Sequence, residues 1–283
     1  VNPVRLEELE YLYLRRGELV METRLKRGGE LDKFALTYGR YLMSRPYKAL
    51  RGLSSEKFPG LLLELDELSI AEFVDDAPND LGKYGLDKPW GELVARDSRS
   101  EMHLLFGDRT GNGLVYFKEA GSPAMYALDE ARVEFLRGFQ PFEYVDKYVF
   151  VPELKDVSRI EVIPKTGARS LTVSRAPVEG PAAPDSTGVL ERFAADGREV
   201  SPEGFKTVFL AVAGLFAEGN TTRAVSGPPE LSIRFELLEG EPVRVDYLPY
   251  DRSFLAVSRD GIAEFAISRE QVNRMLAELE ALR

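Results

Sequence analysis

The feature that most constrains the fold is a hydrophobic pattern that occurs once in each half of the chain. Apolar residues at helical spacing begin at Phe58, four positions after a serine that can cap a helix, and the same pattern begins again at Phe205. Each position of the first pattern has a counterpart 147 residues later. The pairs are Ser54 and Ser201, Phe58 and Phe205, Leu61 and Val208, Leu62 and Phe209, Leu65 and Val212, and Leu68 and Leu215. So many matches predict a tandem repeat.

The segments around these helices follow one order in both halves. An opening hairpin is expected at 9–21 and again at 157–174, and a further strand pair or an extended segment at 31–42. Alternating apolar residues then predict strands at 93–96, 102–106, 115–118 and 125–128. A short helix capped by Asp129 closes the first half, and a helix beginning at Ser268 closes the second. A Pro/Gly/Ala-rich excursion is expected at 176–188, within the second half.

We therefore predict an α+β protein of two tandem related domains, each an antiparallel sheet covered by an amphipathic helix. The first α+β repeat is assigned to residues 1–150 and the second to 151–283, with the boundary near 148–155. The distance in sequence between corresponding residues of the two copies is 147 at the long helix but 140 at Pro89, which corresponds to Pro229. The first copy therefore carries seven extra residues between these points. They fall in the acidic loop at 75–84, where the copies differ most.

Composition excludes several classes of function. A net charge of −10 and a pI near 5.0 disfavour nucleic acid as a partner. The absence of cysteine excludes disulfides, thiol catalysis and thiolate metal sites. The apolar runs are far too short to span a membrane, so the chain is expected to be soluble as it stands. Because the first residue is Val1, with no initiator Met, we expect a preceding segment to have been removed.

No residue pattern predicts catalysis. His103 is the only histidine, and its counterpart 140 residues later is Val243, which indicates a structural position. The glycine-rich segment at 107–113 joins two predicted strands and lacks the Lys-Ser/Thr pair of a phosphate loop, so a hairpin turn is favoured. The acidic residues at 75–80 do not have EF-hand spacing. We predict no catalytic residue, no cofactor and no metal site.

One family resemblance rests on two neighbouring parts of the sequence. They are Tyr84-Gly85-Leu86-Asp87-Lys88-Pro89 and Leu104-Leu105-Phe106-Gly107-Asp108, followed by Val115-Tyr116-Phe117-Lys118 and Tyr126-Ala127-Leu128-Asp129. With these residues the chain resembles a bacterial domain-of-unknown-function family, DUF4340. The resemblance implies an extracytoplasmic protein that is held by one N-terminal membrane helix and is encoded beside gliding-motility-type ABC transporter components. We expect that this anchor is the segment removed before Val1. It brings no catalytic residues.

The expected function is that of a non-enzymatic, extracytoplasmic accessory protein in an ABC-type transport or gliding-motility-like system. The partner is expected to be a membrane protein of that system, contacted through the loop in which the two copies differ. The predicted contact residues are Asp75, Asp76, Asp80, Tyr84 and Trp90. Three alternatives stay open: a protein that binds cell-envelope glycans, a carboxylate-dependent hydrolase with two opposed acidic groups in a cleft, and a structural spacer.

Overall fold

A computed structural model describes residues 3–29, 40–177, 189–259 and 261–282. The chain divides into two compact units, Val1–Asp146 and Lys147–Arg283. Most of the extended segment predicted at 31–42 and most of the excursion predicted at 176–188 lie outside the described residues. Each unit is described separately below.

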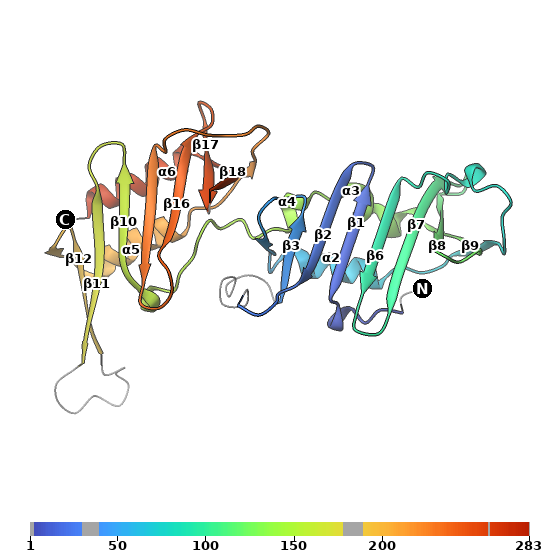
Figure 1. Ribbon diagram of the computed structural model, residues 1–283, viewed down its shortest axis with the longest axis horizontal. Helices are drawn as coiled ribbons and strands as arrows, with labels where there is room; N and C mark the ends of the chain where they lie inside the picture. Colours follow the sequence, from blue (N-terminus) through green and yellow to red (C-terminus); the bar gives the residue numbers. More distant parts are fainter. Residues whose placement is uncertain (1–2, 30–39, 178–188, 260, 283) are drawn as a thin grey trace. The chain divides into compact units, whose positions relative to one another are not determined.

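The first unit contains a nine-stranded antiparallel sheet with the order β4-β3-β2-β1-β6-β7-β8-β9-β5 (Figure 1). Its strands are β1 (Tyr11–Arg16), β2 (Leu19–Leu25), β3 (Tyr41–Arg45), β4 (Arg51–Gly52), β5 (Glu72–Asp75), β6 (Gly91–Arg96), β7 (Glu101–Arg109), β8 (Leu114–Glu119) and β9 (Met125–Asp129). Its helices are η1 (Leu6–Glu8), α2 (Lys57–Asp66), η2 (Gly82–Tyr84), η3 (Glu130–Val133), α3 (Glu134–Gly138) and α4 (Pro141–Tyr144).

The second unit contains a nine-stranded antiparallel sheet with the order β13-β12-β11-β10-β15-β16-β17-β18-β14. Its strands are β10 (Val157–Pro164), β11 (Arg169–Pro177), β12 (Val189–Ala195), β13 (Arg198–Glu199), β14 (Gly219–Asn220), β15 (Leu231–Leu237), β16 (Val243–Pro249), β17 (Phe254–Arg259) and β18 (Ile262–Ser268). Its helices are η4 (Leu154–Asp156), α5 (Pro202–Ala213) and α6 (Arg269–Ala281). Strand by strand, the order is that of the first sheet, so the two units share one topology.

Local sequence explains where the elements begin and which side chains face the core. Leu12 and Leu14 are fully buried in β1, while the residues between them are half-buried, as the alternation predicts. The Ser54 hydroxyl accepts a hydrogen bond from the Lys57 amide at 3.1 Å, and the Ser201 hydroxyl accepts one from Gly204 at 3.1 Å. These contacts satisfy amides that the first helical turn leaves unpaired. The predicted cap at Ser201 is therefore confirmed, whereas Ser54 makes its hydrogen bond just before α2, whose N-cap is Glu56.

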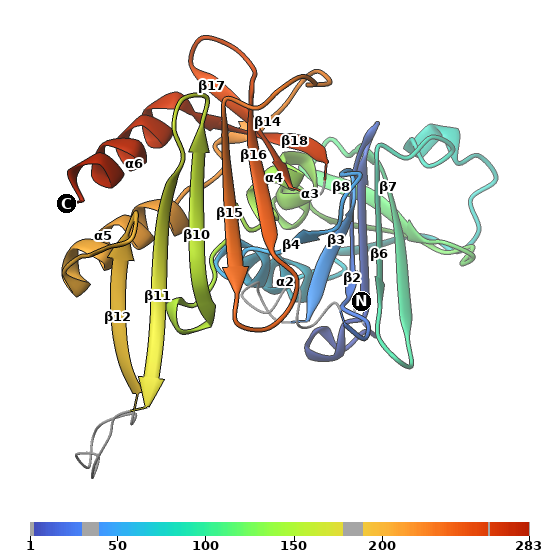
Figure 2. The same cartoon turned by 60° about the vertical axis from the view of Figure 1, so that its left-hand side comes forward.

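Each unit has an apolar interior to which strands and helices both contribute. Phe58, Leu61 and Leu65 are the buried residues of α2. In the second unit, the buried side chains of α5 and α6 belong to one cluster with those of the strands, and Figure 2 shows both helices beside that sheet. A mixed, sheet-rich fold with two sheet domains is thus present as predicted. In the described part of the chain, no helix combines the length and apolar character needed to cross a membrane.

Candidate functional site

The loop between β5 and β6 folds onto β7 around Gly107. A Cβ atom built on Gly107 would lie 2.1 Å from the carbonyl oxygen of Tyr84 and 2.9 Å from the Cγ of Leu86. Gly85 has a φ of +68°, and a Cβ atom there would lie 2.6 Å from the side chain of Asp108. Only glycine fits at both positions without a shift of the surrounding atoms. The two parts of the sequence that carry the family resemblance therefore pack directly on each other.

Trp90 anchors the other end of this loop at the same glycine. Its indole Nε1 donates a hydrogen bond of 2.6 Å to the carbonyl oxygen of Gly107. That carbonyl lies where the pairing of β7 with β8 is interrupted, between Phe106 and Arg109. The guanidinium of Arg137 lies over the indole ring, 4.2 Å from its centroid. The polar atom of Trp90 is thus satisfied inside the unit, and its contact with a partner stays a prediction.

The predicted aspartates precede this anchored segment, at the end of β5 and in the first part of the loop. Asp75 accepts a hydrogen bond from the Ala77 amide at 3.0 Å, and Asp80 accepts one from Gly82 at 2.9 Å, so both carboxylates shape turns. Asp76 and Asp80 are exposed and Asp75 is half-buried. Among the residues that the structure describes, no three His, Asp or Glu side chains are grouped so that they could hold a metal ion.

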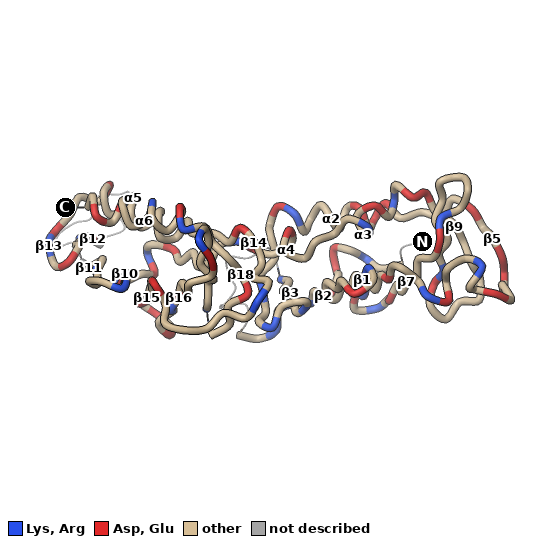
Figure 3. The backbone as a smooth tube through the Cα atoms, turned by 90° about the horizontal axis from the view of Figure 1, so that it is seen from above, with Lys and Arg blue, Asp and Glu red and all other residues tan. Residues whose placement is uncertain are grey.

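Negative charge accumulates between α2 and η2 without compensating cations. Residues 58–82 contain no Lys or Arg. Their acidic residues are Glu64, Asp66, Glu67, Glu72, Asp75, Asp76 and Asp80. Within the described ranges, Glu67 is the member of this set that forms an ion pair, with Arg132. Figure 3 marks acidic positions in red along this segment, around α2 and β5. We call the part of the first unit that this segment forms the acidic surface; the exposed Lys83 and Lys88 follow it in the loop before β6.

An exposed aromatic ring lies on that acidic surface. Phe73, in the edge strand β5, has 52% of its side chain exposed. Phe73 is the last ring in a series of aromatic contacts that runs from strand to strand toward the edge of the sheet. The successive contacts are Trp90 to Phe106 at 6.0 Å, Phe106 to Phe117 at 6.2 Å, Phe117 to Tyr126 at 5.7 Å and Tyr126 to Phe73 at 5.7 Å. Our sequence analysis missed Phe73, although its counterpart at the 147-residue offset is the polar Asn220.

A polar network lies on the other face of the first sheet. The Glu92 carboxylate accepts a hydrogen bond of 2.8 Å from Arg15 Nε, and its other oxygen lies 2.8 Å from His103 Nε2. These contacts connect β1, β6 and β7. Burial alone would raise the pKa of Glu92, but the hydrogen bonds and charges of Arg15 and His103 outweigh burial and hold the pKa below its ordinary value. The side chain of His103 points to this polar face, as the alternation of β7 predicts.

Two adjoining depressions follow α2 on the side where it faces η3, α3 and α4. One, of about 300 Å³, is lined by Glu56, Lys57, Gly60, Leu61, Glu64, Glu143 and Tyr144. The other, of about 470 Å³, is lined by Glu64, Glu67, Ala131, Arg132, Glu134 and Phe135. Glu64 lies at their junction, and burial, followed by repulsion from Glu67, raises its pKa. These depressions were not foreseen, because their walls come from segments far apart in the sequence.

A family model described as "Domain of unknown function (DUF4340)" matches residues 54–222, which is more than half of the chain. The chain belongs to the DUF4340 family. The matched region begins at Ser54, just before α2, and includes both Tyr84 and Gly107, so the predicted family resemblance is confirmed. No curated protein and no solved structure matches the chain.

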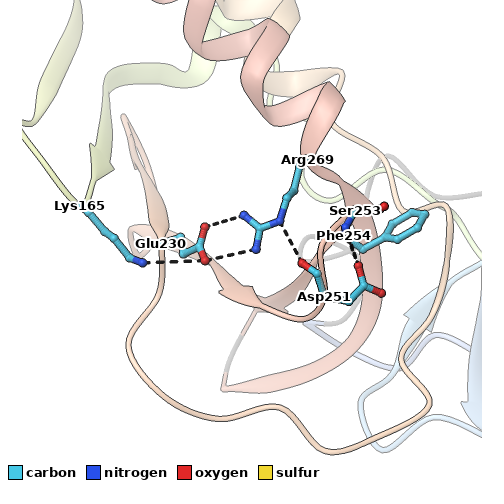
Figure 4. A network of polar contacts seen from close by, with 6 residues as sticks. All are labelled: Lys165, Glu230, Asp251, Ser253, Phe254 and Arg269. Carbon is cyan, nitrogen blue, oxygen red and sulfur yellow. Dashed lines mark hydrogen bonds and ion pairs between the residues drawn. The ribbon is translucent and has the colours of Figure 1, made fainter.

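In the second unit of this DUF4340 protein, a glutamate that forms ion pairs occupies the position that corresponds to Trp90. Glu230, 140 residues after Trp90, accepts two hydrogen bonds from the Arg269 guanidinium, at 2.7 and 3.2 Å (Figure 4). Arg269 Nε also donates to the carbonyl oxygen of Asp251 at 3.1 Å, and Lys165 lies 3.8 Å from Glu230. The hydrogen bond from Arg269 lowers the pKa of Glu230. Acidic charge here is neutralised internally, in contrast to the acidic surface of the first unit.

Proposed function

We propose that this DUF4340 protein is a non-enzymatic, extracytoplasmic accessory protein that binds a membrane protein of an ABC-type transport or gliding-motility-like system. The contact is assigned to the β5 side of the first unit, with Asp75, Asp76 and Asp80 beside the exposed ring of Phe73. The extracytoplasmic location, the N-terminal anchor and the transporter association rest on the family resemblance.

The observation that carries this proposal is the way the loop is held. Tyr84 and Trp90 both contact Gly107, so the segment between them is anchored at its two ends before any partner arrives. A preorganised loop loses less conformational entropy on binding than a mobile one. The loop lies next to carboxylates without ion-pair partners in the described residues, which attract a cationic partner and speed its association.

The two units have different roles in this proposal. We take each sheet to be covered on one face by an amphipathic helix, α2 in the first unit and α5 in the second. A duplicated fold permits one copy to remain structural while the other acquires a site, and fold alone does not assign a function to either. We assign the partner contact to the first unit because its acidic loop is longer and its edge strand carries Phe73 where the second unit has Asn220.

The test is affinity capture from detergent-solubilised membranes of the source bacterium, with the purified chain as bait and mass spectrometry as readout. Three baits are compared: the natural chain, a variant with Asp75, Asp76 and Asp80 changed to Ala, and a variant with Phe73→Asn. The matched control changes three exposed carboxylates of the second unit to Ala, namely Glu199, Glu239 and Glu241. Circular dichroism and thermal melting establish that each bait is folded.

Enrichment of ABC transporter subunits by the natural chain and the control, with loss in the Asp triple variant and in Phe73→Asn, is the expected result. Equal recovery of transporter subunits by all four baits would show that the contact does not lie on the β5 side. Recovery of envelope glycans without any transporter subunit would overturn the accessory role in favour of glycan binding, and recovery of neither would favour the structural spacer.

A carboxylate-dependent hydrolase is a second candidate, favoured by one observation. Glu64 and Glu143 line the same depression, and the pKa of Glu64 is raised, as a general acid requires. Incubation of the chain with purified cell-wall glycan tests it, with released reducing ends as readout and Glu64→Gln as the comparison. Release of sugar by the natural chain that Glu64→Gln abolishes would establish the hydrolase, and we expect no release.

A further inference from the structure

The second unit shows a helix packed along α5. Helix α6 contacts α5 on the same side of the sheet (Figure 2). Its buried residues are Val272, Met275 and Leu279. At the end of α6, Leu282 approaches the first turn of α5 so closely that a Cβ atom on Gly204 would lie 3.0 Å from its Cδ1. Positions 204, 208 and 211 of α5 form one stripe of small or apolar residues at helical spacing. Gly204, which Leu282 approaches, belongs to this stripe, so we take the stripe to be the side of α5 that faces α6.

In the first unit the helix that packs beside the corresponding stripe is broken into two short pieces, of which α4 contacts α2. The segment equivalent to α6 is helical only to Gly138, and after a break the chain makes the four-residue helix α4. The residues of α2 that correspond to Gly204, Val208 and Ala211 are Lys57, Leu61 and Glu64. These three residues line the 300 Å³ depression described above. The depressions therefore lie between α2 and the broken counterpart of α6, whereas α6 itself is one continuous helix in contact with α5.

The chemistry of the two depressions differs from that of the α5 stripe. Leu61, Phe135 and Tyr144 contribute apolar surface. Around them stand five glutamates and only two cations, of which Arg132 is paired with Glu67. Glu64, at the junction, has no ion-pair partner among the described residues. A helix that docks here must bring positive charge opposite Glu64 as well as an apolar face.

We propose that the groove formed by these two depressions, from Glu56 to Glu67 along α2, binds a cationic amphipathic helix of a partner protein. The eleven residue steps of α2 between these glutamates correspond to about 16 Å, or roughly three helical turns. A partner helix of that length presents apolar side chains at i, i+4 and i+7 to the groove, and a Lys or Arg beside them meets Glu64. The inference rests on the proposed binding role but concerns a surface distinct from the loop at 75–90.

The probe is a fluorescein-labelled synthetic peptide with the sequence of residues 268–282, in which Glu270, Glu278 and Glu280 are replaced by Lys. It keeps the apolar face that α6 uses in the second unit and carries a positive charge. Binding to the full chain is measured by fluorescence anisotropy at 50 and 300 mM NaCl. A scrambled peptide of the same composition separates helix recognition from charge attraction.

Three variants of the chain locate the binding site. Glu64→Lys reverses the charge at the centre of the groove, and Asp66→Lys makes the same change on an exposed position of α2 outside it. Gly60→Trp fills the groove from an exposed helical position where an added Cβ atom meets nothing within 4 Å, and it replaces a residue unfavourable to helices. Helix content and melting temperature show that all three variants fold.

The expected result is peptide binding that Glu64→Lys and Gly60→Trp each weaken at least ten-fold, while Asp66→Lys changes it less than three-fold. The scrambled peptide is expected to bind at least ten-fold more weakly than the probe. Equal weakening of peptide binding by Glu64→Lys and Asp66→Lys, or unchanged binding to Gly60→Trp, would overturn the proposal that the peptide binds in the groove. Because the capture experiment uses variants of the β5 side, its failure leaves this result unaffected, and the two proposals fail separately.

Discussion

The carbonyl oxygen of Tyr84 occupies the space in which a side chain on Gly107 would lie. A Cβ atom there would be 2.1 Å from that oxygen, and the Gly107 carbonyl in turn accepts the hydrogen bond of the Trp90 indole. One glycine thus contacts both ends of the segment 84–90, which directly follows the acidic loop that distinguishes the first unit. The stability of this segment is the quantity on which the proposed partner contact depends.

Gly107→Ala is expected to lower the free energy of unfolding of the first unit by about 1–3 kcal/mol, because either Tyr84 or β7 must move to make room for the methyl group. Urea unfolding followed by circular dichroism measures the change. Gly111→Ala is the control, since an added Cβ atom at Gly111 meets nothing within 4 Å, and its effect should stay within about 0.5 kcal/mol. Similar costs for both substitutions would contradict the close contact.

Trp90→Phe keeps most of the aromatic surface but removes the indole donor. We expect a loss of about 1–2 kcal/mol, because the carbonyl of Gly107 is left without its 2.6 Å hydrogen bond. Urea unfolding measures the loss. Amide hydrogen exchange at 82–90 is also expected to accelerate, whereas exchange in β10 of the second unit should be unaffected. A loop that exchanges at the natural rate in the variant would show that the indole does not anchor it.

Thr23→Val is expected to stabilise the first unit by about 1 kcal/mol. The Thr23 hydroxyl is fully buried in β2 and has no hydrogen-bond partner in the described part of the structure. Burial of an unpaired hydroxyl costs free energy that a methyl group avoids. Thermal melting measures the gain. Thr207→Val, at an exposed position of α5 where the hydroxyl donates to the carbonyl oxygen of Glu203, should bring no gain. A destabilised Thr23→Val would mean that the hydroxyl is satisfied.

Stability should depend on pH through Glu92. Its folded-state pKa is depressed by Arg15 and His103 despite burial, so its contribution is fully present above the unfolded pKa of about 4.3 and is lost as pH falls through the folded value. Urea unfolding at pH 7, 5, 4 and 3 should show a smaller fall for Glu92→Gln than for the natural chain. Glu101→Gln, in a half-exposed pair with Arg96, is the control and should follow the natural chain.

Sequence alone determined the features that depend on neighbouring residues and on repetition. Ser201 could be recognised as a cap because a cap acts on amides two or three residues away. The burial of Leu12 and Leu14 follows from the two-residue period of a strand. The common strand order of the two sheets is consistent with the constant offsets between their helices and strands, because equal patterns favour equal elements.

Tertiary structure decided what lies at the candidate sites, because those contacts join segments distant in the chain. Tyr84 and Gly107 are 23 residues apart, and nothing in either segment alone shows that a carbonyl oxygen fills the place of a side chain. The exposure of Phe73 depends on β5 being an edge strand, which is a property of the strand order. Glu64 lies in a groove because α3 ends at Gly138, whereas the equivalent helix of the second unit continues to Ala281. Local patterns determine elements, and only their packing determines which surfaces stay open to a partner.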